Sequence, residues 1–112
     1  MSIKILAVGD VCGEPGLSFL KERLKDFKKE NDIRFCVVNG ENANVVGITP
    51  KQADQILQAG ADVITLGNHT WTRTELRPYL DERNRILRPA NCAPQCPGRG
   101  VGVDSRDFGD VV

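Results

Sequence analysis

At 112 residues, the chain is long enough for one domain with a modest core. Its fifteen basic and fifteen acidic residues balance, so composition does not direct the whole chain toward duplex nucleic acid or an anionic membrane surface. The apolar stretches are too short for a signal-peptide core or a membrane span, and we therefore expect a cytoplasmic protein without membrane contact.

Four cysteines in a mixed α/β sequence favour reduced thiols over a disulfide scaffold. Cys92 and Cys96 are one residue too far apart for the usual zinc pair, and no second pair accompanies them. Cys36 is expected to be a small buried side chain. Cys12 lies two residues after Asp10 and is more readily explained as an apolar filler than as a ligand to zinc or iron, although both interpretations stay open.

Short β-branched stretches predict strands at residues 3–8, 33–38 and 61–66, the last of them buried on both faces. The strand ends are about 30 residues apart, the usual length of a strand, crossover helix and return strand, which predicts parallel strands. The first helix is expected to begin near Pro15, and the second at Pro50 after the N-cap Thr49. Inward-facing positions on the first helix are expected at Leu17, Leu20, Leu24 and Phe27.

The remaining sequence predicts smaller elements. Residues 72–75 resemble a capping box for a short helix through Leu80, and residues 85–87 fit a fourth strand. A segment rich in proline and glycine follows, and residues 101–104 and 110–112 are expected to pair as an antiparallel hairpin. The expected fold class is therefore α/β, a parallel sheet flanked by helices with a C-terminal hairpin.

Each of the three main strands is followed by a glycine and then by an oxygen-bearing side chain, namely Asp10, Glu41 and Asn68. Because the carboxyl ends of parallel strands meet at one edge, these side chains should converge. Carboxylate and amide oxygens suit divalent cations, and Glu41 is our candidate for a carboxylate that bridges two of them. If the loop stays extended, His69 points away from Asn68, which suits protonating or polarising a leaving oxygen.

These strand ends resemble the calcineurin-like metallophosphoesterases, whose signature includes Gly-Asn-His after a strand. More narrowly, the chain resembles the YmdB-like bacterial phosphodiesterases. Four motifs carry the narrower resemblance: Gly-Asp-Val-x-Gly-x-x-Gly at 9–16, Asn-Gly-Glu-Asn-Ala at 39–43, Gly-Asn-His-Thr-Trp at 67–71 and Arg-Pro-Ala-Asn at 88–91. The resemblance implies one half of a metallophosphoesterase-type α/β sandwich.

The same resemblance implies a dinuclear metal phosphoesterase that hydrolyses cyclic nucleotides or other small phosphodiesters through metal-bound hydroxide. Asp10, Glu41 and Asn68 would be metal ligands, and Asn42 a further ligand or a substrate contact. His69 would contact the substrate as the acid near its leaving group. Iron, manganese, zinc and magnesium are not distinguished.

Two departures bear on this resemblance. The broader superfamily has a histidine where this chain has Cys12, which favours the narrower family. The chain also has no histidine besides His69, whereas the family draws later histidine ligands from a C-terminal half. We therefore expect residues 1–112 to be the N-terminal half of a longer enzyme, with little or no activity alone.

Two other functions remain open. The chain could be a catalytically silent interaction module that pairs through an open sheet edge with itself or with a complementary half. A nucleotide-binding domain that uses the loop at residues 9–16 is less favoured, because this loop fits neither the Walker pattern nor the dinucleotide fingerprint.

Overall fold

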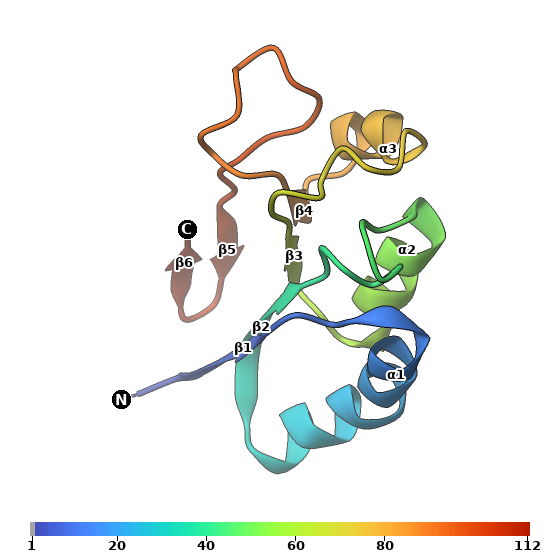
Figure 1. The fold of residues 1–112 in the computed structure, drawn as a ribbon. Helices are drawn as coiled ribbons and strands as arrows, with labels where there is room; N and C mark the ends of the chain where they lie inside the picture. Colours follow the sequence, from blue (N-terminus) through green and yellow to red (C-terminus); the bar gives the residue numbers. More distant parts are fainter. Residues whose placement is uncertain (1) are drawn as a thin grey trace.

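The computed structural model describes residues 2–112 and is an α/β fold (Figure 1). Strands and helices alternate through the first four strands, and a short hairpin follows. In chain order the elements are β1 (Lys4–Val8), α1 (Gly13–Glu30), β2 (Ile33–Asn39), α2 (Pro50–Ala59), β3 (Val63–Thr65), α3 (Leu76–Glu82), β4 (Ile86–Leu87), β5 (Asp104–Arg106) and β6 (Gly109–Val111).

The first four strands form one parallel sheet in the order β1-β2-β3-β4, which confirms the expected sheet. Crossovers between parallel strands are right-handed, so successive crossovers that step in the same direction place their helices on the same face. Figure 1 shows α1, α2 and α3 on one side of the sheet and the β5–β6 hairpin on the other. The helices thus flank the sheet on one face only.

The face opposite the helices is only partly covered. In β3, Ile64 is fully buried on the helix side, whereas Val63 and Thr65 stay partly exposed, so the expectation of burial on both faces is wrong. The antiparallel β5–β6 hairpin covers part of this open face. A hollow of about 270 Å³ remains between hairpin and sheet, and residues lining it include Phe35, Val37, Val63, Thr65, Val103 and Val111.

The core lies between the sheet and the helices. Leu17, Leu20 and Leu24 of α1 are buried there, as is Cys36 of β2. Phe27 was expected to join them but is 45% exposed. In the last turn of α1 the inward position is occupied instead by Lys28, whose Nζ donates to the carbonyl of Gly60 at 2.7 Å.

The three helices differ in how strongly the neighbouring sequence determines where they begin. At α2 the expected cap is confirmed, because Thr49 and Gln52 form a reciprocal capping box. Helix α1 begins at Gly13, two residues before Pro15. The capping box expected at residues 72–75 is wrong: Glu75 precedes α3 without a side-chain cap, and backbone bonds of consecutive turns lead into the helix. No helix within residues 2–112 is long and apolar enough to cross a lipid bilayer.

Candidate functional site

The strand ends converge at the carboxyl edge of the sheet. Asn42 follows β2 and Asp10 follows β1, and the side-chain amide of Asn42 donates to Asp10 Oδ1 at 2.9 Å. The backbone N–H of His69, after β3, donates to Glu41 Oε2 at 2.8 Å. Two hydrogen bonds thus join the three strand ends, and candidate residues 27 to 32 positions apart in sequence meet in one network.

His69 is the most connected side chain of this network. Its Nδ1 lies 3.1 Å from Asn42 Oδ1 and 3.5 Å from Glu41 Oε2. Its Nε2 lies 3.4 Å from the side-chain nitrogen of Asn68, so the expectation that the ring points away from Asn68 is wrong. The loop is not extended there: Thr70 N donates to the carbonyl of Gly67 at 3.2 Å, and this turn brings the neighbouring side chains together.

The backbone of the site is tightly constrained. A Cβ atom at Gly67 would lie 2.6 Å from the carboxyl carbon of Glu41, so any residue other than glycine would force this carboxylate to shift. Asp10 and Val45 both have positive φ, at 26° and 66°. Such conformations cost about 1–3 kcal/mol for non-glycine residues and persist only where the surrounding structure imposes them.

The carboxylates of the site have no permanent cationic partner. Among residues 2–112, no Lys or Arg nitrogen lies within 4.0 Å of the carboxylate of Asp10 or Glu41. The side chain of Glu41 is nevertheless only 13% exposed. A largely buried carboxylate without a counter-charge is costly, and a cation would relieve that cost.

The donor set fits part of a divalent-cation site. Asp10, Glu41, Asn42 and Asn68 offer the carboxylate and amide oxygens that hard cations take. The amide oxygens are needed as ligands. Among the described residues, no group of three or more His, Cys, Asp or Glu side chains is close enough to hold a metal without them. The set is thus suited to share a cation rather than to enclose two.

Cysteine takes no part in the network as observed. Cys12 is exposed at the N-cap of α1, so its interpretation as an apolar filler is wrong; the preceding Val11 takes the buried position. Cys92 and Cys96 are partly exposed in the loop after β4, and all four cysteines are free. Burial raises the pKa of the Cys36 thiol to about 11, as befits a core side chain.

Arg88 is a feature that the sequence reasoning did not single out as functional. It directly follows β4, is only 7% exposed, and donates to the carbonyls of Pro97 at 3.1 Å and Pro89 at 3.2 Å. Its backbone N–H also bonds to the carbonyl of Arg99, which closes the loop after β4. The Arg-Pro-Ala-Asn motif was the available signal, and the structure gives Arg88 a role in holding this loop.

Comparisons with known proteins show which proteins this chain is similar to. The family model described as YmdB-like protein matches residues 6–110. A 2',3'-cyclic-nucleotide 2'-phosphodiesterase from Bacillus subtilis is 40% identical over 100 residues, which are 88% of this chain and 38% of that protein. The chain thus spans less than half the length of this relative.

Two solved structures share the fold. One is a novel phosphatase from Mycoplasma pneumoniae, 27% identical with a TM-score of 0.87, and the match covers 98% of this chain and 41% of that one. The other is a hypothetical protein from Thermus thermophilus, 31% identical with a TM-score of 0.83, covering 95% and 41%. Each match covers nearly all of this chain and less than half of the solved one.

Proposed function

The chain belongs to the YmdB-like protein family, and from this membership we propose that the complete protein is a metal-dependent phosphoesterase that hydrolyses cyclic nucleotides or other phosphodiesters. The Bacillus subtilis relative is named for this reaction class, and the Mycoplasma pneumoniae structure is described as a phosphatase. We include a cytoplasmic location in the proposal, supported by the four free cysteines.

The observation that carries the proposal is the network at the carboxyl edge of the sheet. Asp10 and Glu41 lie there without Lys or Arg partners among residues 2–112, and Asn42 and Asn68 add amide oxygens. We assign these four side chains to divalent cations, with Glu41 as the bridging carboxylate and Asn42 also in reach of the substrate. Bound divalent cations would neutralise phosphoryl oxygens and make a water molecule more acidic.

His69 is the candidate catalytic and substrate-binding residue. Its Nδ1 faces Asn42 Oδ1 and Glu41 Oε2, both hydrogen-bond acceptors, so a proton on Nδ1 is held within the network. Nε2 is then the nitrogen that can hold a second proton and pass it to the leaving oxygen of a phosphodiester. The side chain is 38% exposed, which leaves it accessible to a substrate.

The test is a phosphodiesterase assay with Mn²⁺ on this chain and on a form extended to the length of its relatives. We expect hydrolysis by the extended form and little or none by residues 1–112, because two cations need about four to six ligands each. Equal activity in both forms would contradict the need for further ligands. Absence of activity in both would contradict the proposed reaction.

A catalytically silent interaction module is the second candidate, favoured by the open edge of β1. This strand lies at the edge of the sheet, and Ile5 is 51% exposed. The terminal strand β6 is paired with β5. Analytical ultracentrifugation tests this function: a chain that stays monomeric at high concentration, alone and with a complementary half, would contradict it.

A further inference from the structure

The loop between β2 and α2, which Figure 1 shows leaving the end of β2, carries two exposed apolar side chains close in sequence to Asn42. Val45 is 65% exposed and Val46 is 40% exposed, three and four residues after Asn42. Single exposed apolar side chains need no explanation on a protein surface. Val45 differs because its backbone conformation also disfavours valine.

Val45 has a φ of 66°, in the left-handed region where a β-branched residue is an outlier. Backbone hydrogen bonds hold it there: Val45 N donates to Asn42 O at 2.8 Å, Val46 N to Asn44 O at 2.7 Å, and Asn44 N to Gly47 O at 2.9 Å. Glycine or asparagine would adopt this conformation at lower cost. The backbone therefore does not explain a valine at this position, and burial explains it only in part, since one methyl group lies beside Gly13 while most of the side chain is exposed.

The position of Val45 relative to the site is set by Asn42. The carbonyl of Asn42 accepts from both Gly13 N at 3.0 Å and Val45 N at 2.8 Å, which ties Val45 to the start of α1. The side chain of the same asparagine bonds to Asp10 and faces His69 Nδ1. Val45 is thus hydrogen-bonded through its backbone to Asn42, the residue whose side chain contacts Asp10 and His69, and it lies near the start of α1.

We propose that Val45 is a specificity-determining residue that packs against the base of a nucleotide whose phosphate lies at Asp10, Asn42 and His69. This inference rests on the proposed function. The exposed methyl groups of Val45 gain from being covered by the flat, apolar face of a base, whereas inorganic phosphate offers no such surface.

The test compares two probes, adenosine 3'-monophosphate and inorganic phosphate, bound to the chain in Mn²⁺ and measured by isothermal titration calorimetry. We expect Val45→Ala to weaken nucleotide binding about three- to tenfold, the effect of losing part of a valine contact, and to leave phosphate binding unchanged. Val101→Ala is the matched control, because Val101 is 62% exposed and lies in the segment before the hairpin. It should change neither affinity.

A second variant separates a substrate contact from a role in the loop. Val45→Gly removes the side chain at a position where glycine is less strained, so its melting temperature should stay equal or rise while nucleotide binding weakens. Equal weakening for both probes, no change for the nucleotide, or a lower melting temperature in Val45→Ala would each overturn the contact. If a form extended to the length of the relatives binds neither probe, the proposed function itself fails.

Discussion

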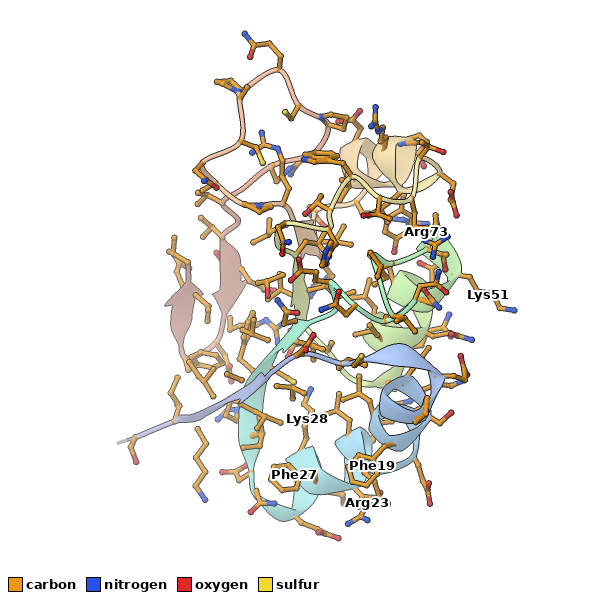
Figure 2. The ribbon with its side chains drawn as sticks, viewed as in Figure 1. Phe19, Arg23, Phe27, Lys28, Lys51 and Arg73 are labelled. Atoms are coloured by element: carbon orange, nitrogen blue, oxygen red, sulfur yellow. The ribbon has the colours of Figure 1, made fainter. Side chains whose placement is uncertain are left out.

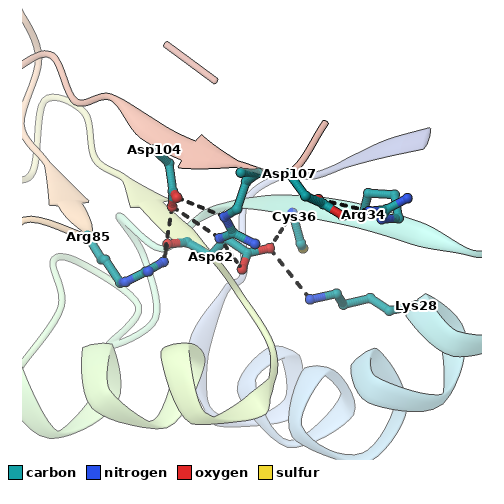
Figure 3. Close-up of polar contacts among 8 residues, drawn as sticks. Lys28, Arg34, Cys36, Asp62, Arg85, Asp104 and Asp107 are labelled. Carbon is teal, nitrogen blue, oxygen red and sulfur yellow. Dashed lines mark hydrogen bonds and ion pairs between the residues drawn. The ribbon is translucent and has the colours of Figure 1, made fainter. Parts of the chain in front are cut away.

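Acidic side chains lie beside both ends of the parallel strands, in different electrostatic environments. Below, the amino edge and the carboxyl edge are the two ends of these strands. At the amino edge, Asp62 and Asp104 are paired with Lys28, Arg85 and Arg106 (Figure 3). At the carboxyl edge, Asp10 and Glu41 have no Lys or Arg partner within the described residues 2–112. The same residue types thus serve the fold at one edge and remain available at the other.

The amino-edge network joins the hairpin to the sheet. Arg106 donates to Asp62 Oδ1 at 2.9 Å and to Asp104 Oδ1 at 2.7 Å, and its guanidinium lies 5.0 Å from the centre of the Phe35 ring. The other oxygen of Asp62 accepts from the backbone N–H of Cys36 at 2.8 Å. Both carboxylate oxygens of Asp62 are therefore bonded inside the protein, where they stabilise the fold.

Arg23, on the exposed surface of α1, does not neutralise the carboxylates of the site. Figure 2 shows Phe19, Arg23 and Phe27 together on the outer side of α1, away from the strand ends. Arg23 lies 5.5 Å from the centre of the Phe19 ring. The cation that we propose at the carboxyl ends of the strands would therefore come from outside this chain, and several substitutions can test the contrast with the amino ends.

Glu41→Gln should have the largest effect. The amide keeps the shape of the side chain and an acceptor for the N–H of His69, but removes the charge that a cation would need. We expect activity of the extended form to fall by more than about 100-fold, since even substitutions behind metal ligands cost about 10–100-fold. Phosphodiesterase assays measure this, and an unchanged melting temperature would show that the fold is intact. Retained activity would contradict the assignment of Glu41.

Gly67→Ala should disturb the same edge through sterics. The added Cβ would lie 2.6 Å from the carboxyl carbon of Glu41, which ends a flexible side chain and must shift, so we expect a loss of about 1 kcal/mol in unfolding free energy, the lower end of the overpacking range. Gly9→Ala is the matched control at another strand end, because nothing lies within 4 Å of its added Cβ. Urea unfolding measures both variants, and similar losses would contradict the steric explanation.

Asp62→Asn should show the reverse of Glu41→Gln, lower stability with activity retained. The side chain of Asp62 is 16% exposed and bonds to Arg106, Lys28 and the Cys36 backbone, so we expect a loss of about 1–2 kcal/mol, reduced from the value of a fully buried pair. The control is Asp107→Asn: Asp107 is 79% exposed in its pair with Arg34, and its loss should stay below about 0.5 kcal/mol. If Asp62→Asn lost activity while its fold stayed intact, this would contradict the assignment of a structural role to the amino edge and a functional role to the carboxyl edge.

The smallest expected effect is a dependence on acid pH. The hydrogen bond from Arg106 holds the pKa of Asp104 below its ordinary value of 3.8, with further attraction from Arg106 and Arg85. Because the folded-state pKa is the lower one, this stabilisation is present above the unfolded-state pKa and is lost as pH falls through the folded-state pKa. Urea unfolding at pH values below about 5 should show a shallower acid loss for Asp104→Asn. If the unfolding free energy fell equally steeply with pH in Asp104→Asn and in the unsubstituted chain, the stabilising role of Asp104 would be contradicted.

Features set by neighbouring residues could be predicted from the sequence, and features set by distant ones could not. The capping box of Thr49 and Gln52 joins residues three positions apart and was predictable. The bond between Asp62 and Arg106 joins residues 44 positions apart and left no local signal. The exposure of Phe27 likewise depended on which residue of the last turn of α1 faces inward, because Lys28 there bonds to Gly60, 32 residues away.

The candidate site divides in the same way. Glycine followed by an acid or amide, repeated after three strands about 30 residues apart, was enough to indicate convergence, because parallel strands bring their carboxyl ends to one edge. The orientation of His69 was not predictable, since a turn at Gly67 rather than an extended loop brings its ring to Asn68. The roles of these side chains in binding and catalysis stay predictions.

By itself, the sequence determined the parallel α/β order and the set of polar residues at the strand ends, because periodicity and glycine placement act over a few residues. Tertiary structure alone decided that all helices lie on one face and that the hairpin covers part of the other. It also decided which acids are neutralised, because the charge around Asp62 or Glu41 depends on side chains brought near by folding.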